Sequence, residues 1–190
     1  MKNKIEAFEL HELRDPKFIE AAFVTYKQNG IPKTWEVVKS HDSVAVLIYH
    51  KEHDGFVLVK QFRPAVYMGG EQDGLTVELC AGIVDKPLSL VDIAREEILE
   101  ECGYSVSSDQ IERITVVNNA VGFAGSRQTL FYVEVDESMH TNAGGGIDTE
   151  LIEVIELPTS EAKSFIYDES IAKTTGLLFA IMWWFDRKKA

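Results

Sequence analysis

The sequence contains few cysteines, which argues against a disulfide-stabilised protein and against a zinc or redox site built from cysteines. Only Cys80 and Cys102 occur in 190 residues, and neither a CxxC pair nor zinc-ligand spacing links them. We therefore expect no disulfide framework, and a reducing compartment such as the cytoplasm fits the chain. The five histidines are scattered and none has metal-binding spacing, so all are interpreted as structural or surface residues.

The sequence also lacks a long apolar run. The longest, residues 176–185, is too short to span a bilayer. Residues 1–13 lack the apolar stretch of a signal peptide. No internal repeat or low-complexity tract is visible. The chain is therefore expected to have no membrane partner and to be cytoplasmic.

Positive charge is scarce as well. The chain has 19 Lys and Arg residues against 31 Asp and Glu residues, which gives a net charge of −12. This balance argues against binding nucleic acid through its phosphates. It does not exclude a nucleotide substrate, because a metal ion can supply the missing positive charge. The length suits one domain, or one domain with a small extension.

Apolar segments of strand length predict a sheet. Residues 21–26 and 35–38 are strand-like, and Asn29-Gly30 between them is a hairpin-turn signal. Residues 1–40 are therefore expected to form a small β region before a main domain at 41–190. Further strands are predicted at 44–49, 56–62, 76–81, 111–117, 129–135 and 151–157, a loop at 67–74, and helices at 89–102, 160–166 and 171–187. This order indicates α/β or α+β.

The helix at 89–102 has clear end signals. Ser89 is placed to cap its start with Asp92 as partner, and Gly103 stands where a left-handed C-terminal cap is expected. Apolar side chains recur at three- and four-residue spacing and form one stripe: Val91, Ala94, Ile98 and Cys102.

Acidic residues crowd the end of this helix. The like-charge pairs Glu96/Glu100 and Glu97/Glu101 each destabilise a helix by about 0.2–0.5 kcal/mol. The helix dipole also disfavours anions in the last turns. Such an arrangement suggests a bound cation, and carboxylate clusters suit Mg²⁺ or Mn²⁺. The alternative is a solvated acidic face, which is the commoner meaning of a charge run.

The spacing in residues 82–104, GIVDKPLSLVDIAREEILEECGY, resembles the Nudix box, Gly-x5-Glu-x7-Arg-Glu-U-x-Glu-Glu-x-Gly-U, in which U is a large apolar residue. Two positions depart from the box. Leu88 stands in place of its first Glu, and Glu96 in place of its Arg, which braces a metal-binding Glu in the family. Arg95 is adjacent but points about a quarter-turn away by helix geometry, so it cannot simply substitute.

The flanking segments VELCAGIVD, GSRQTLFYVEV and GGGIDTELIEV resemble the nucleoside-diphosphate-sugar branch of the Nudix hydrolases. The resemblance implies an α/β/α sandwich with a mixed sheet, hydrolysis of a phosphoanhydride, and a Mg²⁺ or Mn²⁺ cofactor. It also implies a homodimer in which the N-terminal sheet is exchanged between subunits.

Site residues follow from the resemblance, position by position. It implies a metal site formed by Ala81 through its carbonyl and by Glu97, Glu101 and Glu150. Glu97, Glu100 and Glu101 are the implied catalytic carboxylates, and Asp148 is the candidate general base in a position where the branch usually has Glu. As a strand start, Asp148 and Glu150 would point the same way, although a polar loop is the alternative.

Three further residues are candidates for substrate binding: Arg63, Glu78 and Arg127. Each arginine can contact phosphate with its planar fork or lie at the surface. Glu78 either supports the site or simply faces the cavity from a strand. Gly144 to Gly146 is either slack in a loop or a hinge that lets the acidic loop close.

Three functions remain open. The first is hydrolysis of UDP-sugars such as UDP-glucose to a nucleoside monophosphate and a sugar phosphate. The second is ADP-ribose hydrolysis, which is disfavoured because residues 119–122 lack the proline that ADP-ribose enzymes tend to carry about there. The third is nucleotide-sugar binding with little turnover, which Leu88 and Glu96 suggest.

Overall fold

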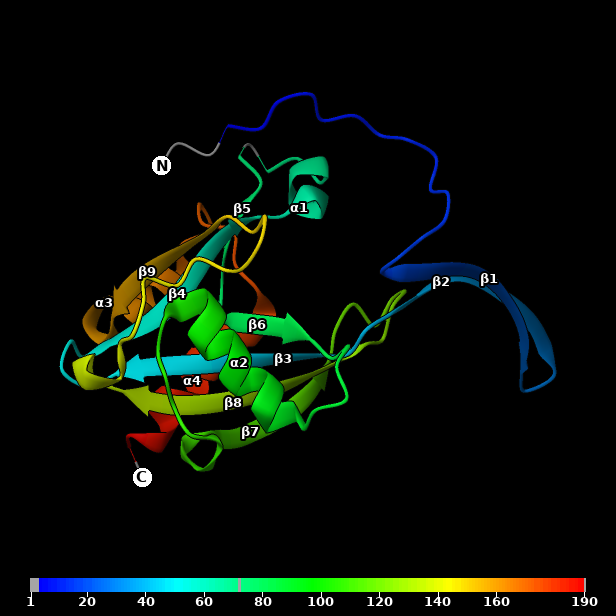
Figure 1. The fold of residues 1–190 in the computed structure, drawn as a ribbon. Coiled ribbons are helices and arrows are strands. Elements are labelled where there is room, and N and C mark those ends of the chain that lie inside the picture. The colour runs from blue at the N-terminus through cyan, green and yellow to red at the C-terminus, as the bar shows by residue number, and fades with distance from the viewer. Residues whose placement is uncertain (1–3, 72, 190) are drawn as a thin grey trace.

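The computed structural model describes residues 4–71 and 73–189. A seven-stranded mixed sheet lies between helices, and a separate two-stranded ribbon projects from it (Figure 1). The ribbon consists of β1 (Ile19–Gln28) and β2 (Ile31–Ser40). The sheet contains β3 (Ser43–His50), β4 (Gly55–Phe62), β5 (Leu75–Glu78), β6 (Cys80–Ile83), β7 (Glu112–Asn118), β8 (Arg127–Val135) and β9 (Ile152–Pro158). The helices are α1 (Pro64–Met68), α2 (Leu90–Cys102), α3 (Thr159–Tyr167) and α4 (Thr175–Arg187), with 3₁₀ turns η1 (Ser108–Gln110) and η2 (Glu137–Met139).

The central strands β3 and β4 diverge along their length. They pair only where residues 48–50 of β3 meet residues 55–57 of β4. Beyond that point β6 pairs with β3 and β5 pairs with β4. Strands β5 and β6 therefore lie in the gap between β3 and β4. Strand β8 runs parallel to β3, and the other pairings are antiparallel. The predicted strand 76–81 is therefore two short strands, because the chain crosses this gap at Leu79.

Helices cover both faces of the sheet. On one face, α2 packs its buried residues against alternate residues of β3, β4 and β8. On the opposite face, α4 and α3 pack against the intervening residues of the same strands. Figure 1 shows α2 in front of the sheet and α4 behind it. The predicted α/β/α sandwich with a mixed sheet is confirmed, and so is the separate β region. The domain boundary at residue 40 stays a prediction.

The apolar stripe of α2 is buried as predicted. Ala94, Ile98 and Cys102 are at most 1% exposed, and Ile93 joins them. Val91 is partly buried against the same cluster. Alternating strand residues and this stripe therefore build one core between α2 and the sheet.

Tertiary contacts change two predicted boundaries. Pro64 starts the short helix α1, which enters the expected loop at 67–74. The last helix begins at Thr175 instead of 171, because the chain before it is extended and Val77 donates its N–H to the Ala172 carbonyl at 2.9 Å. Within the described residues no helix has the length and apolar character needed to cross a membrane.

The hairpin turn of the ribbon adopts the backbone that its sequence favours. Asn29 and Gly30 both have positive φ, at 53° and 80°, as a two-residue primed turn requires. The base of the ribbon is held by the loop before β8. Val38 N–H donates to the Phe123 carbonyl at 2.8 Å, and Trp35 Nε1 donates to the Gly122 carbonyl at 2.6 Å.

Both ends of α2 are capped as predicted. The Ser89 hydroxyl accepts from Asp92 N–H at 3.2 Å, and Gly103 adopts the left-handed conformation with φ 78°. The glycine tract then packs on this helix end. Gly145 N–H donates to the Glu101 carbonyl at 2.8 Å, and Gly146 N–H donates to the Glu100 carbonyl at 3.0 Å. The tract thus satisfies helix carbonyls that lack an intrahelical partner, so its interpretation as slack is wrong.

We predict that Gly103→Ala destabilises the fold. A Cβ at residue 103 would lie 1.9 Å from the Asn142 carbonyl oxygen, in a left-handed conformation. The backbone conformation alone costs about 1–3 kcal/mol for a residue with a side chain. Urea unfolding measures the loss. Gly122→Ala is the matched control, since nothing lies within 4 Å of its Cβ position. Equal stability of the two variants would contradict the prediction.

Candidate active site

The candidate site lies where the chain crosses the gap between β3 and β4. Here β6 faces the last turns of α2, and Gly82 meets Glu97. A Cβ on Gly82 would lie 2.0 Å from Glu97 Oε1, so the glycine is needed for the carboxylate to lie against the strand. Helix α2 and strand β6 are thus packed closely enough to bring the backbone of β6 together with the side chains of Glu97 and Glu101.

Glu101 is the most buried acid of the site. It is 4% exposed, and its Oε2 accepts from the Ala81 N–H at 2.9 Å. Burial raises the pKa of Glu101 to about 8, against the lowering effect of that hydrogen bond, and the charge of Glu97 raises it further. A carboxylate in this position is costly unless a cation neutralises it.

Glu97 lies one helical turn earlier and is partly buried. Burial raises the pKa of Glu97 to about 7, and the neighbouring charge of Glu100 adds to the effect. Glu150 raises the pKa of both Glu97 and Glu101, which places the late loop close to the helix acids. Perturbed acids that gather in this way are typical of functional sites, although structural networks produce them too.

Arg63 and Glu78 form a bidentate ion pair beside these acids. Arg63 donates from Nε and Nη2 to the two oxygens of Glu78, both at 2.8 Å. Thr76 also donates to Glu78 at 2.5 Å. Glu78 raises the pKa of Arg63, as do the charges of Glu101 and Glu150. Both residues therefore belong to the cluster, and Glu78 holds Arg63 in place.

The late acidic loop differs from its predicted geometry. Strand β9 begins at Ile152, so Asp148 and Glu150 lie in a turn, and Asp148 has a positive φ of 53°. The prediction that they point the same way as a strand start is therefore wrong. Glu150 folds back and accepts from Ile147 N–H at 2.9 Å. Both residues are exposed.

Arg127 is engaged elsewhere. Its Nε and Nη2 donate to Asp42 Oδ2 at 3.0 and 2.8 Å, and its backbone N–H donates to Oδ1. This pair joins the starts of β3 and β8. The structure thus does not bring Arg127 into the acid cluster as it does Arg63.

The two departures from the box have local explanations. Leu88 is an exposed loop residue. Glu96 accepts from Lys86 Nζ at 2.9 Å, and the charge of Lys86 lowers the pKa of Glu97. Arg95 lies near Asp92 at 3.7 Å, in agreement with its predicted direction. Sequence reasoning missed Lys86, because a loop lysine carries no signal of where its side chain ends.

The donor set suits a hard divalent cation. The predicted set consists of the Ala81 carbonyl and the side chains of Glu97, Glu101 and Glu150, and oxygen ligands are those that Mg²⁺ and Mn²⁺ prefer. Burial and, after it, the neighbouring acids raise the pKa of Glu97 and Glu101, and a bound cation would favour their charged forms. In the described part of the chain the carboxylate oxygens of Glu97, Glu101 and Glu150 do not all lie within 4.8 Å of one another.

One group of metal-binding side chains does meet that distance. It comprises His50, His53 and Glu137, at the other end of β3. The interpretation of the histidines as structural or surface residues rests on their spacing in sequence, which carries no sign that the fold brings two of them to one glutamate. Glu137 lies more than eighty residues after the histidines, so only the fold could bring them together.

Comparison with known proteins gives relatives over most of the chain. Uridine diphosphate glucose pyrophosphatase NUDT14 of Bos taurus is 42% identical over 189 residues, which covers 85% of this chain and 85% of that protein. The Mus musculus protein of the same name is 40% identical, with 85% and 86% covered. A GDP-mannose pyrophosphatase of Pectobacterium atrosepticum is 34% identical, with 94% of each chain covered. No family model matches the chain.

These matches cover 85% to 94% of the chain, which is far more than the box helix. They agree with the box spacing at residues 82–104 and with the acids that α2 presents to β6. The chain belongs to the Nudix family, in its branch of nucleoside-diphosphate-sugar pyrophosphatases.

Proposed function

We propose that this enzyme hydrolyses UDP-glucose-type nucleotide sugars to a nucleoside monophosphate and a sugar phosphate, with Mg²⁺ or Mn²⁺. The observation that carries the proposal is the buried carboxylate of Glu101 beside Glu97 and Ala81, at the crossing between β5 and β6. Similarity to the UDP-glucose pyrophosphatases of cattle and mouse supports this choice of substrate.

The residues that would hold the ion are Ala81, through its carbonyl oxygen, Glu97, Glu101 and Glu150. When bound, such an ion offsets the charge of the diphosphate and activates water for attack on phosphorus. The negative charge of Glu100 raises the pKa of Glu97, and the bound ion would offset this charge as well. Lys86 limits the repulsion among these acids from the loop before α2.

Arg63 would orient the diphosphate. Glu78 occupies its Nε and Nη2, which leaves Nη1 without a hydrogen-bond acceptor among the described residues and available to a phosphate oxygen. Arginine suits this role because its guanidinium stays charged and planar. The ion pair with Glu78 fixes the direction in which Nη1 points. Arg127, which is paired with Asp42, would reach substrate only if that pair opened.

Asp148 would act as general base. In the reaction a water oxygen bonds to phosphorus, the phosphoanhydride P–O bond breaks, and the water proton passes to a carboxylate. Asp148 is exposed in the loop that also carries Glu150. The glycine tract anchors this loop to the end of α2, where it could act as a hinge that brings Asp148 to the substrate.

Two related substrates compete with UDP-glucose. GDP-mannose is a candidate because several relatives are named GDP-mannose pyrophosphatases. ADP-ribose remains the second candidate from the sequence. The third hypothesis, binding with little turnover, is weaker because Glu97 and Glu101 are both present and Lys86, which pairs with Glu96, also lowers the pKa of Glu97.

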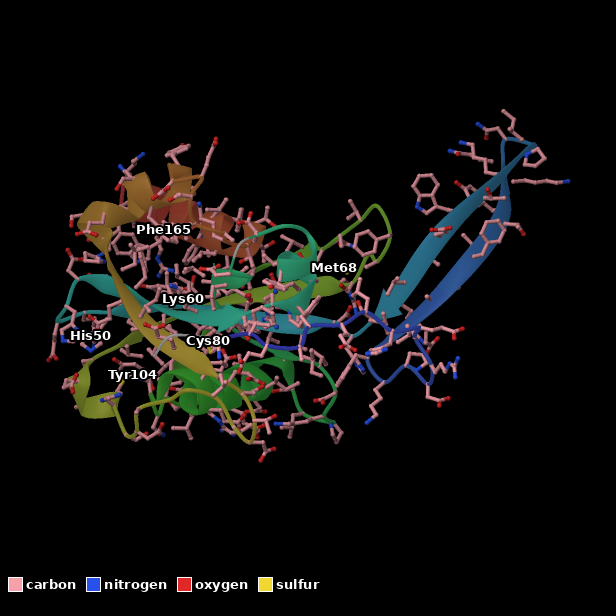
Figure 2. The ribbon with its side chains drawn as sticks, turned by 90° about the horizontal axis from the view of Figure 1, so that it is seen from above. His50, Lys60, Met68, Cys80, Tyr104 and Phe165 are labelled. Atoms are coloured by element: carbon pink, nitrogen blue, oxygen red, sulfur yellow. The ribbon has the colours of Figure 1, made fainter. Side chains whose placement is uncertain are left out.

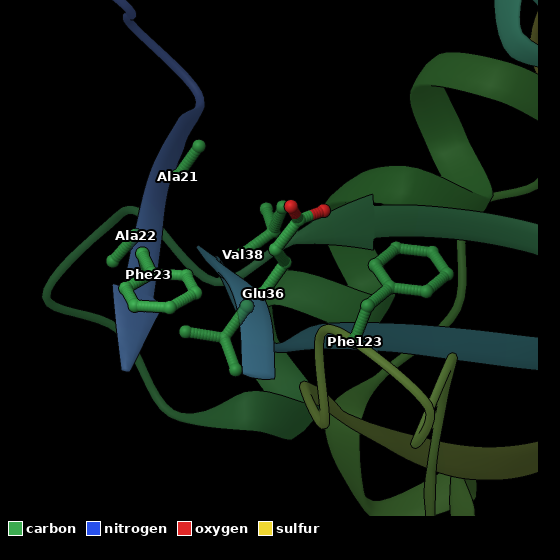
Figure 3. A pocket seen from close by; sticks show the side chains of 7 residues that line it. Ala21, Ala22, Phe23, Glu36, Val38 and Phe123 are labelled. Carbon is green, nitrogen blue, oxygen red and sulfur yellow. The ribbon is translucent and has the colours of Figure 1, made fainter. Parts of the chain in front are cut away.

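We also propose a homodimer that uses the ribbon. Apolar side chains project from both of its faces with large exposed fractions, 66% for Phe23 on one face and 61% for Ile31 and 56% for Trp35 on the other. An exposed apolar surface of this kind marks an interaction site. Figure 3 shows an open hollow at its base, where Phe23, Glu36 and Val38 face the side of Phe123. A second ribbon of the same kind would cover these residues.

A cytoplasmic location is proposed from the cysteines. Cys80 and Cys102 are both free and buried in the core beside the acid cluster, and thiols of this kind persist in a reducing compartment.

We predict that a substrate panel with Mg²⁺ separates the hypotheses. UDP-glucose should show the highest kcat/KM, with GDP-mannose and ADP-ribose lower by about tenfold or more, a difference that about 1.4 kcal/mol of binding in the transition state supplies. Chromatography of the products should show UMP and glucose 1-phosphate. Preferred ADP-ribose turnover would overturn the choice of substrate. Binding of all three without turnover would establish the third hypothesis.

Glu101→Gln is predicted to remove most hydrolysis and leave the fold intact. Loss of residues that only orient a metal ligand already costs about 10–100-fold, so loss of the ligand should cost at least about hundredfold in kcat. Without metal at pH 9, where the wild-type carboxylate is charged, the variant should melt at a higher temperature than the wild type, because a buried charge is removed. Glu169→Gln, at an exposed turn, is the control. Wild-type turnover in Glu101→Gln would count against the site.

The dimer is testable by sedimentation. The chain has a mass of 21.4 kDa, so the wild type should sediment with about twice that mass. Phe23→Asp should shift the population towards single chains, because it places a charge in the apolar contact. Phe179→Asp, at an exposed position on α4, should not. A wild type that sediments as one chain at assay concentrations would contradict the dimer.

A further inference from the structure

A second group of metal-binding side chains lies far from the acid cluster. His50 ends β3, His53 lies in the turn that follows, and Glu137 begins η2 after β8. Ala81 pairs with Ala45, five residues before His50, which places the two sites about 17 Å apart along the strand. Figure 2 shows His50 and Tyr104 at the end of the molecule opposite the ribbon. The proposed hydrolysis uses none of these residues.

His50 has a buried polar atom without a partner. The side chain is 0% exposed, and its Nε2 makes no hydrogen bond within the described residues. The nearest charged atom is Glu137 Oε2, at 3.8 Å. Native proteins pair nearly all buried polar atoms, so the Nε2 atom marks a place that another group is expected to fill.

His53 brings a second imidazole next to His50. Its ring stacks on that of His50 with centroids 3.8 Å and planes 14° apart, so it must turn before both in-plane lone pairs can reach one ion. Its Nδ1 lies 2.9 Å from Glu156 Oε1, which holds the proton on Nδ1 and leaves the lone pair of Nε2 free. A carboxylate behind a histidine is the usual arrangement around a metal-ligating imidazole.

Glu137 supplies the third ligand from a different part of the chain. Its Oε2 faces His50, and its Oε1 lies 3.7 Å from His140 Nδ1. One donor atom of His50, His53 and Glu137 each lies within 4.8 Å of the other two. Ligands on one zinc ion at about 2.1 Å require a closer approach. The exposed side chains of His53 and Glu137 can make that movement, since 44% and 63% of their surfaces are free.

We propose that His50, His53 and Glu137 bind one divalent transition-metal ion, and that zinc is the best match. Two imidazoles and one carboxylate suit zinc, whereas Mg²⁺ and Mn²⁺ prefer oxygen. Binding requires the lone pair of His50 Nε2. Without the ion, the backbone N–H of His53 donates to His50 Nδ1 at 3.3 Å, so the ring proton of His50 lies on Nε2. On metal binding this proton would move to Nδ1, and the hydrogen bond from His53 would be replaced by the metal–nitrogen bond.

The ion would reinforce a link that already exists at this edge, where Lys51 N–H donates to the Val135 carbonyl at 2.9 Å and Glu137 N–H donates to Glu52 Oε2 at 3.3 Å. It would tie the turn between β3 and β4 to η2, which leads through residues 140–142 to the glycine tract on α2. The site would therefore stabilise the fold, and it would not take part in hydrolysis.

Zinc titration of the full-length protein tests the site. The protein is stripped with chelator and then titrated calorimetrically in excess Mg²⁺, which occupies the carboxylates of α2. One zinc ion should bind, and His53→Asn and Glu137→Gln should each weaken its affinity by at least about tenfold. Both residues are exposed, so the variants should fold, which their melting temperatures in chelator check. His11→Asn, at an exposed position in the N-terminal segment, should bind zinc as the wild type does.

Two outcomes would overturn the proposal. One is a zinc affinity that is unchanged in both His53→Asn and Glu137→Gln. The other is loss of zinc binding in Glu101→Gln with those three ligands intact, which would place the ion at the acid cluster. The visible spectrum of the Co²⁺ protein gives an independent reading, since its ligand-field bands should disappear in the His53 and Glu137 variants. None of these readings depends on activity, so the site and the proposed hydrolysis can fail separately.

Discussion

The carboxylate of Glu101 is the constraint on which the rest of the site depends. It is buried at the carbonyl end of a helix, where the dipole disfavours an anion, and one backbone N–H from Ala81 is its hydrogen-bond donor in the described structure. Its pKa is raised to about 8 by burial and by its acidic neighbours. The charged form of such an acid lowers the stability of the fold, and a bound divalent cation would restore that stability.

The divergence of β3 and β4 makes this arrangement possible. The gap between them admits two short strands, and the crossing between these strands exposes backbone atoms beside α2. The glycine tract then attaches the late acidic loop to the same helix end through hydrogen bonds to Glu100 and Glu101. Sheet topology and helix capping therefore bring three distant segments to one place, and the proposed metal-dependent hydrolysis of a nucleotide sugar would use that convergence.

Much of the fold could be predicted from local pattern. The caps of α2 at Ser89 and Gly103 and the turn at Asn29-Gly30 were predictable, because each depends on the backbone preference of the residues themselves. The last helix was predicted to begin too early, because the segment before it lies extended along β5. The box acids could be named from their spacing, whereas the bond between Arg63 and Glu78, the approach of Lys86 and the pairing of Arg127 with Asp42 could not.

By itself, the sequence determined the helix that carries the acids, the family and the class of reaction, since these follow from residue type at fixed spacing. Only the tertiary structure decided which arginine joins the acids, how the late loop is held, and that two histidines meet a glutamate more than eighty residues away. The physical reason is the same in each case. The spacing of residues in the chain sets the direction in which side chains point from one helix or strand. Charge pairing and burial depend on residues of other helices, strands and loops.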